Sequence, residues 1–142
     1  MALNRVFNIA GSAMAAQATR LNTTASNIAN ADSAHGDASQ VYRARHPVFA
    51  ATESRFDRLL GQEATTVGVA IRGIVESDVP LAQRHAPGHP NADENGNVYV
   101  TNVSAVEEMV NMMSASRSYQ SSIEIINTTK ELLTQTLSMG NG

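Results

Sequence analysis

The sequence contains no cysteine and no tryptophan, and only 4% of its 142 residues are aromatic. The missing cysteine excludes disulfide bonds, thiolate zinc sites and cysteine nucleophiles, and it leaves no redox chemistry from which to infer a compartment. Hydrophobic residues still make up 42% of the chain, so much of the apolar content is small. The length suits one ordinary domain, but these side chains offer modest material for a compact core.

Positive charge is also limited, because ten Lys and Arg stand against thirteen Asp and Glu and the formal net charge is -3. Proteins that bind nucleic acid generally neutralise phosphates with a stripe of Lys and Arg. This sequence has no such stripe. We therefore expect no nucleic-acid partner.

The first 22 residues contain no apolar run of signal-peptide or membrane-span length. Polar residues interrupt the segment at Asn4, Arg5, Asn8, Gln17 and Arg20. We expect no cleaved signal peptide and no direct membrane insertion. If the protein is exported, it uses a route that does not cleave a conventional signal.

Residues 3–31 have the pattern of a helix with an apolar residue at every seventh position. These positions are Phe7, Met14, Leu21 and Ile28. Small residues flank this stripe at Gly11, Ala18 and Ala25, so a neighbouring helix could approach closely along one side. The pattern predicts a helix that packs lengthwise against another.

The middle segment, residues 32–101, contains all four prolines of the chain. Residues 67–75 alternate apolar and other side chains, which is typical of a half-exposed strand. Asn95-Gly96, a pair that favours tight turns, precedes a second short apolar run at 98–100. We expect a small β-rich insertion here.

A second long helix is predicted over residues 104–139. It opens with a capping-box pattern at Ser104 and Glu107, in which each side chain can satisfy a free backbone donor. Its predicted seam combines two sets of positions, each repeating every seven residues: Ala105, Met112, Tyr119, Ile126 and Leu133 with Met109, Ser116, Ile123, Lys130 and Leu137.

These patterns predict a mainly α fold with a small β-rich insertion, in which long N- and C-terminal helices pair as a coiled-coil-like hairpin. In this organisation the N-terminal helix (1–31) and the C-terminal helix (102–142) form one assembly domain, separated in sequence by the middle segment (32–101). Two helices that share a single seam bury little surface relative to the entropy lost on ordering them. We therefore expect the termini to order fully only when copies or partners pack together.

No catalytic, cofactor-binding or metal-binding site is predicted. His85 and His89 lie four residues apart, but prolines break any helix there and no third ligand completes a zinc set. The segment 91–102 imitates the start of a calcium loop, yet its first position is Asn and its last is Asn102 instead of Glu. Glu107 and Glu108 fit a helix cap better than an acid/base pair. We expect that the protein is not an enzyme and needs no cofactor.

Several stretches resemble one known family. The resemblance is carried by "ASNIANAD" at 25–32, by "VYRARHPVF" at 41–49, and by residues 88–133, which contain "GHPNADENGNVYVTNVSAVEEMVNMMSASRSYQ" and then "NTTKELL". They are similar to the axial proteins of the bacterial flagellar rod and hook, and the last run resembles proximal rod proteins in particular. One departure is "DSAHGDASQVYRA" at 32–44, where the family commonly has Pro-Gly-Tyr.

The resemblance implies a structural subunit that is exported by the flagellar type III pathway without a cleaved signal peptide. It would assemble in the periplasm into the basal-body rod that transmits torque. The implied partners are copies of the chain, other proximal and distal rod proteins, and the adaptor between the rod and the membrane ring.

Fifteen residues are predicted to form the assembly interface, most of them on the apolar seams and the remainder as polar register contacts. They are Phe7, Met14, Leu21, Asn27, Ile28, Asn30, Met109, Met112, Arg117, Tyr119, Gln120, Ile123, Ile126, Leu133 and Leu137. Arg117 is offset from the seam, so a solvated side chain is the default for it, and a salt bridge to a neighbouring subunit is the alternative. The alternative function is a soluble helical adaptor or export chaperone of the flagellar secretion system, which would use the same seam to hold a partner.

Overall fold

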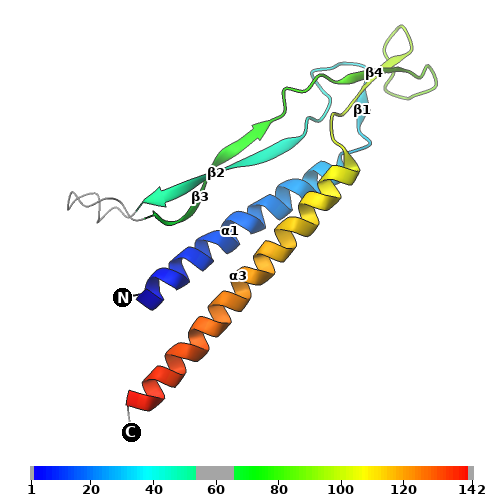
Figure 1. Cartoon of the computed structure of the whole chain (residues 1–142). Coiled ribbons are helices and arrows are strands. Elements are labelled where there is room, and N and C mark those ends of the chain that lie inside the picture. Colours follow the sequence, from blue (N-terminus) through cyan, green and yellow to red (C-terminus); the bar gives the residue numbers. More distant parts are fainter. Residues whose placement is uncertain (1, 54–65, 141–142) are drawn as a thin grey trace. The chain divides into compact units, whose positions relative to one another are not determined.

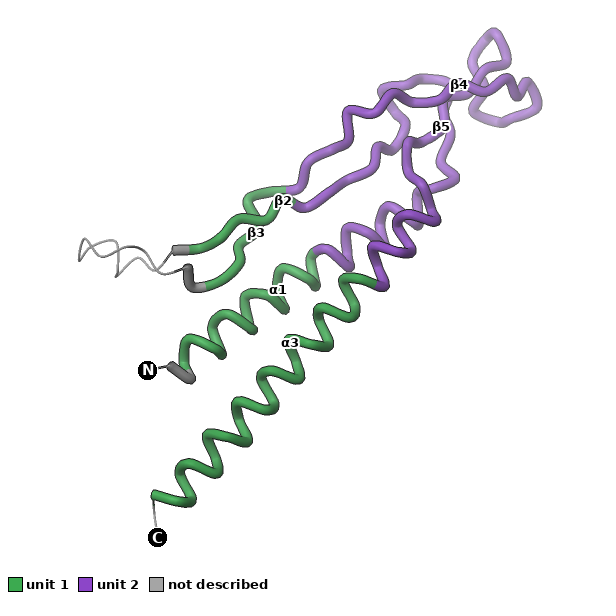
Figure 2. The backbone as a smooth tube through the Cα atoms, viewed as in Figure 1, with its two compact units in different colours: residues 1–19, 48–73, 114–142 green, residues 20–47, 74–113 purple. Residues whose placement is uncertain are grey.

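The computed structural model describes residues 2–53 and 66–140 (Figure 1). The chain divides into two compact units, which Figure 2 shows in different colours. Unit 1 comprises residues 1–19, 48–73 and 114–142, and unit 2 comprises residues 20–47 and 74–113. Each unit is described by itself.

Two long helices account for most of the regular structure in the described residues. Helix α1 spans Ala2–Ala29, and helix α3 spans Ala105–Gly140. The amide of Asn30 donates to the carbonyl of Asn27 at 3.1 Å, a bond over three residues that tightens the last turn of α1. The Ser104 half of the capping box predicted for α3 is confirmed, because the Ser104 hydroxyl accepts a hydrogen bond from the amide of Glu107 at 3.4 Å.

Strands β2 (Arg45–Glu53) and β3 (Thr66–Glu76) form a two-stranded sheet and run in opposite directions (Figure 1). In unit 1 the Ser12 hydroxyl of α1 accepts a hydrogen bond from the amide of Val69 at 3.1 Å and donates to the carbonyl of Ile9. Gly68 is buried here, and a Cβ at this position would overlap the Ser12 hydroxyl. One serine and one glycine thus let the helix approach the backbone of β3 closely.

Unit 2 contains a three-stranded antiparallel sheet in the order β1 (Ala34–His35), β5 (Asn97–Val100) and β4 (Ala82–His85). Its centre is β5, which pairs on both sides. Val98 of β5 is fully buried. The short strand predicted at 98–100 therefore exists and occupies the middle of the sheet.

A tight turn precedes β5, as Asn95-Gly96 predicted. Gly96 has a φ of +73°, a conformation that glycine adopts without strain. The Asp93 carboxylate accepts hydrogen bonds from the amides of Asn95 and Asn97, at 2.9 and 2.7 Å. The carboxylate of Asp93, which lies in the segment that resembles a calcium loop, thus accepts hydrogen bonds from backbone amides of its own turn.

The buried side chains are small or polar. Among the described residues the buried apolar ones are Ala10, Ala16, Val41, Ala44, Val98 and Ala115, and the buried polar ones are Thr23, Thr24, Asn27, Glu108, Ser122 and Thr129. Val98 and Asn27 are the largest of the fully buried side chains. The interior therefore contains few large apolar contacts, as the composition suggested.

The predicted fold class is wrong in two respects. In the described residues five strands form two small sheets beside the two long helices, and the long helices do not form a clear coiled-coil hairpin. The strand content was underestimated because alternation marks only part of β3 and none of the nine-residue strand β2.

The coiled-coil prediction failed because the residues that α3 buries do not belong to an apolar seam. The positions buried at intervals of seven are Glu108, Ala115, Ser122 and Thr129. Predicted seam residues such as Met109 and Leu137 are exposed instead. Small buried side chains allow close backbone approach, whereas a coiled coil needs large apolar knobs at these positions.

Candidate assembly surface and polar latch

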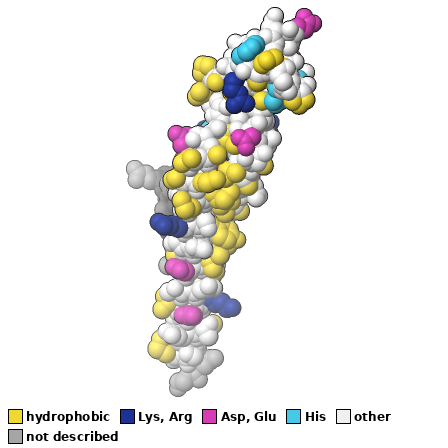
Figure 3. Space-filling view, turned by 90° about the vertical axis from the view of Figure 1, so that its right-hand side faces the viewer, with side chains coloured by type: hydrophobic (Ala, Val, Ile, Leu, Met, Phe, Trp, Pro, Cys, Tyr) yellow, Lys and Arg dark blue, Asp and Glu magenta, His cyan; other side chains and the backbone are white. Residues whose placement is uncertain are grey.

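Four apolar side chains project from the first turns of α3. They form what we call the outer stripe: Val106, Met109, Val110 and Met113. Their spacing of three, four and seven residues places them on one face of the helix, and each is between 53% and 73% exposed. Hydrophobic side chains also gather on the face that Figure 3 turns to the viewer. A contiguous exposed apolar surface of this kind is typical of a protein-binding site.

The far end of α3 is exposed throughout, because no residue from 131 to 140 is buried or half-buried. It nevertheless carries large apolar side chains. We call Ile125, Leu132, Leu133, Leu137 and Met139 the distal set, and all five are exposed. An isolated helix gains little stability from such side chains until another surface covers them.

The structure places the fifteen predicted interface residues in three environments. Asn27 is buried; Phe7, Met14, Leu21, Ile28, Asn30, Met112, Tyr119, Ile123 and Ile126 are half-buried; Met109, Arg117, Gln120, Leu133 and Leu137 are exposed. The half-buried residues retain surface that a neighbouring subunit could cover. Their role in assembly stays a prediction.

The prediction omitted six exposed apolar residues of α3. They are Val106, Val110, Met113, Ile125, Leu132 and Met139. Spacing could have identified them, since Ile125, Leu132 and Met139 repeat every seven residues and Val106, Val110 and Met113 follow a helical face. The sequence pattern does place Val106, Val110 and Met113 beside the seam near the start of the helix, but the predicted interface was restricted to the seam itself.

Asn27, Tyr42 and Arg45 form a hydrogen-bonded cluster, which we call the polar latch, that joins α1 to β2 within unit 2. The amide nitrogen of Asn27 donates to the carbonyl of Arg45 at 2.8 Å, and its amide oxygen accepts from the amide of Arg45 at 3.0 Å and from the hydroxyl of Tyr42 at 2.9 Å. The side chain is 0% exposed. A buried amide with these partners fixes one arrangement, because losing any of them leaves polar groups unsatisfied.

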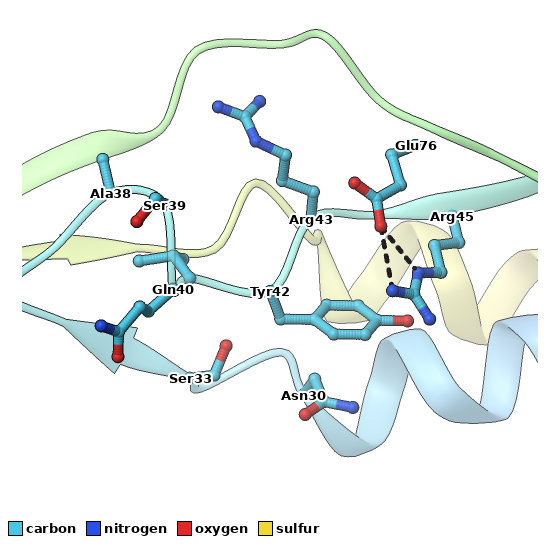
Figure 4. A pocket seen from close by; sticks show the side chains of 10 residues that line it. Asn30, Ser33, Ala38, Ser39, Gln40, Tyr42, Arg43, Arg45 and Glu76 are labelled. Carbon is cyan, nitrogen blue, oxygen red and sulfur yellow. Dashed lines mark hydrogen bonds and ion pairs between the residues drawn. The ribbon is translucent and has the colours of Figure 1, made fainter.

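An ion pair extends the latch to β3. The guanidinium of Arg45 donates two hydrogen bonds to one carboxylate oxygen of Glu76, at 2.9 and 3.1 Å (Figure 4). The same guanidinium lies 5.3 Å from the centre of the Tyr42 ring. The pair is about half exposed, so it contributes at most about 1 kcal/mol and mainly sets geometry.

A second amide, that of Asn102, ties the segment before α3 to the rest of unit 2. Its oxygen accepts from the amide of Ala44 at 2.8 Å, and its nitrogen donates to the carbonyl of Val79 at 2.9 Å. Asn102 stands in the last position of the segment that resembled a calcium loop. Its side chain holds two loops together here.

Helices α1 and α3 are also linked in unit 2 by polar side chains. The guanidinium of Arg20 donates to the amide oxygen of Asn111 at 3.1 Å, and the Asn111 nitrogen lies 3.5 Å from the carboxylate of Glu108. Glu108 is buried, whereas Glu107 is exposed. The two adjacent acids therefore differ in role: Glu107 belongs to the exposed cap, and Glu108 is buried beside Asn111, the residue that binds Arg20 of α1.

Among the described residues, Asp37 has a pKa that departs clearly from its ordinary value. The amide of Ser39 donates to its carboxylate at 2.8 Å, and the Ser39 hydroxyl donates at the same distance. These bonds, the backbone one first, lower the pKa of Asp37 below 3.8, because they favour the charged form. The carboxylate serves to hold the turn in the segment where the sequence departs from the family pattern.

The described residues contain no group of three His, Asp or Glu side chains that could hold a metal ion. His85 pairs with the amide oxygen of Asn97 at 3.1 Å, and His89 accepts from the amide of Asn91 at 3.2 Å. In the same part of the chain, no helix is long and apolar enough to cross a membrane.

Comparison with known proteins gives matches at both ends and over the whole length. A family model for "Flagella basal body rod protein" matches residues 7–36, and one for "Flagellar basal body rod FlgEFG protein C-terminal" matches residues 94–139. The chain is 50% identical to the flagellar basal-body rod protein FlgC of Salmonella typhimurium, over 99% of both chains. It is 46% identical to that of Escherichia coli O157:H7, over 99% of both, and 36% identical to that of Buchnera aphidicola from Acyrthosiphon pisum, over 98% of both.

Proposed function

Because the chain belongs to the FlgC family of flagellar basal-body rod proteins, we propose that the exposed apolar faces of α3 join it to its neighbours in the rod. The resemblance recognised from the motifs is confirmed. The protein is a structural subunit of the flagellar basal-body rod, and this role implies no enzymatic activity.

The observation that supports the proposal is the distribution of side chains on α3, whose exposed faces carry the large apolar residues. Its buried positions carry small or polar residues, while the outer stripe and the distal set are exposed. Covering the four side chains of the outer stripe contributes roughly 3–8 kcal/mol, since full burial of such a side chain is worth about 1.5–3 kcal/mol and each is already partly covered. Several such contacts per subunit suffice for a stable assembly.

We propose that residues 1–31 and 102–142 act as one assembly domain and that the middle segment, 32–101, lies outward. Stiffness along long helices and neighbours locked against sliding are what a torque-transmitting shaft requires. The half-buried residues Met112, Tyr119 and Ile126 would pack within and between subunits, and Asn30, Arg117 and Gln120 would fix the register. Asn27 would contribute indirectly, by holding the end of α1 in place.

The proposed partners are further copies of the chain, other proximal and distal rod proteins, and the adaptor between the rod and the membrane ring. We also propose that the chain is exported by the flagellar type III pathway without cleavage of a signal peptide and works in the periplasm.

The experiment that tests the interface introduces one charge into the outer stripe. In cells that lack their own copy of the protein, Val110→Glu should prevent recovery of the chain in detergent-resistant basal bodies and abolish swimming, because a buried unpaired carboxylate opposes assembly. The control is Ser118→Glu, an exposed position off the stripe on the same helix. It should leave both readouts close to those of the unchanged chain.

The same fractionation separates the two candidate functions. A rod subunit should co-purify with basal bodies, whereas an adaptor or chaperone should stay in the soluble fraction. Normal incorporation and swimming of the Val110→Glu chain would refute the assignment of the outer stripe to assembly.

A further inference from the structure

Methionine thioethers are the groups that a mild oxidant attacks first in this protein. The sequence has six methionines but no cysteine and no tryptophan, the other residue types that peroxides oxidise readily. Among the described residues, Met14 and Met112 are half-buried. Met109, Met113 and Met139 are each more than half exposed. Because an oxidant has to reach the sulfur, these three react fastest in the free chain.

Two of the three exposed methionines form half of the outer stripe. Met109 and Met113 lie four residues apart, so they are neighbours on one face of α3, together with Val106 and Val110. Backbone atoms inside a helix are largely covered, and the exposed area of Met109 and Met113 therefore belongs mainly to their side chains. Each of these side chains carries its sulfur near the outer end.

Hydrogen peroxide converts a thioether into a sulfoxide. A lone pair of the sulfur attacks one peroxide oxygen, and the O–O bond breaks as the S–O bond forms. The sulfur loses two electrons, and the departing hydroxide takes the proton of the transferred hydroxyl group and leaves as water. The product is a polar, chiral side chain in place of an apolar one.

A sulfoxide at Met109 or Met113 affects assembly more than it affects the free chain. In the free chain the new oxygen stays hydrated, because both residues are exposed. A partner that covers the outer stripe removes this water, and the side chains of Val106 and Val110 offer no hydrogen-bond donor in its place. Burying a polar group without a partner is unfavourable, so two oxidised side chains oppose assembly twice.

The other methionines are less suited to such control. Met14 and Met112 react more slowly because they are half-buried. Met139 is exposed, but the other four members of the distal set are Ile and Leu, which peroxide does not oxidise under mild conditions. The outer stripe, by contrast, carries sulfur at two of its four positions. It is therefore the apolar surface of α3 whose polarity oxidation changes most.

We propose that Met109 and Met113 form an oxidation-sensitive switch of assembly. Hydrogen peroxide converts both to sulfoxides in the free chain, and the oxidised chain is excluded from the rod. Once the outer stripe is covered in the rod, the same two sulfurs are protected. A methionine sulfoxide reductase with a thiol reductant restores the thioethers. This inference rests on the proposed function, in which the outer stripe joins the subunit to its neighbours.

A footprint compares the free and the assembled chain. Purified chain and isolated basal bodies that contain it are treated with the same concentration of hydrogen peroxide, and sulfoxide at each methionine is measured over time by mass spectrometry of peptides. In the purified chain, Met109 and Met113 should react faster than Met14 and Met112. In basal bodies, Met109 and Met113 should lose most of their reactivity.

A peroxide pulse in cells tests the consequence for assembly. Cells that lack their own copy make the chain with or without sublethal peroxide, and the fraction recovered in basal bodies is measured. For the unchanged chain this fraction should fall in proportion to the sulfoxide found at Met109 and Met113 in the unassembled chain. A chain with Met109→Leu and Met113→Leu should show no such fall relative to its own value without peroxide. A Met139→Leu chain should be as sensitive to peroxide as the unchanged chain.

A permanent polar substitute tests the same surface without an oxidant. Glutamine resembles methionine sulfoxide in length and polarity, and it has a helix propensity close to that of methionine. A chain with Met109→Gln and Met113→Gln should therefore keep α3 intact. Its incorporation should be about tenfold or more below that of the double Leu chain, because two polar groups are left unsatisfied on burial.

Two results would overturn the switch: equal peroxide sensitivity of the double Leu chain and the unchanged chain, or incorporation of the double Gln chain equal to that of the double Leu chain. The footprint separates these results from a failure of the proposed function. If Met109 and Met113 reacted as fast in basal bodies as in the purified chain, the outer stripe would be uncovered, and both proposals would fail.

Discussion

At the scale of single residues, amide side chains hold distant segments together, a role that large apolar side chains have in most protein interiors. Asn27 and Asn102 each connect backbone segments that lie far apart in sequence. Hydrogen bonds of this kind add about 0.5–1.5 kcal/mol each, but leaving their partners buried and unsatisfied costs more. Unit 2 is therefore specified by a few polar groups, and it is sensitive to their loss.

We expect Asn27→Ala to lower the free energy of unfolding by about 2–4 kcal/mol, because three buried hydrogen bonds disappear together. The measurement is chemical denaturation of the purified chain. Asn30→Ala is the matched control, since the Asn30 side chain makes one bond, to the carbonyl of Ser26 in its own helix. A similar small loss for both variants would contradict the latch.

At the scale of elements, α3 carries two competing helical faces. The predicted seam and the buried face are shifted by one position, as Met109 and Glu108 illustrate. A shift of one residue corresponds to a rotation of about 100° around the helix axis. Which of the two faces is buried therefore decides which side chains are covered within the chain and which remain exposed. Close approach of the backbone favours the face with Ala115 and Ser122.

The half-buried face of α3 offers a second test of assembly. Replacing Met112 and Ile126 together by Asp should abolish incorporation into the rod and motility while synthesis of the chain continues, because two charges would enter packed surfaces. The measurement combines immunoblots of whole cells and of basal bodies with a swimming assay. The control replaces the same two residues by Leu, which keeps the face apolar and should leave incorporation and swimming close to those of the unchanged chain. Normal swimming of the double variant would reject the role of this face.

At the scale of the whole molecule, the described residues bury few large side chains while two long helices must remain ordered. Ordering the backbone costs about 1–2 kcal/mol of conformational entropy per residue. The distal set is exposed in the free chain, so its side chains add little burial energy to offset that cost. We therefore expect the full helix content to depend on neighbours. This agrees with a subunit that becomes rigid where it is assembled.

Circular dichroism of the free chain should show this dependence. We expect dilute purified protein to have less helix than fully ordered helices over Ala2–Ala29 and Ala105–Gly140 would give, and to gain helix as its concentration rises. The Val110→Glu chain provides the control, since it should not gain helix with concentration. A dilute monomer that is fully helical and melts cooperatively would contradict the expectation.

The sequence by itself determined the family, the two long terminal helices, the Ser104 cap and the turn at Gly96. All of these depend on motifs or on interactions between residues that are near one another along the chain. They could be predicted because each motif, cap or turn involves only residues that are close together in the sequence.

Only the tertiary structure decided which face of α3 is buried and how Asn27 is satisfied. Tyr42 and Arg45 meet Asn27 across 15 and 18 residues, and no periodic pattern encodes such a meeting. Which face of a helix is buried depends on how closely its backbone can approach another segment. In this chain the face with small side chains permits that approach, whereas the prediction chose the face with the most apolar residues. The residues of the outer stripe are exposed for the same physical reason.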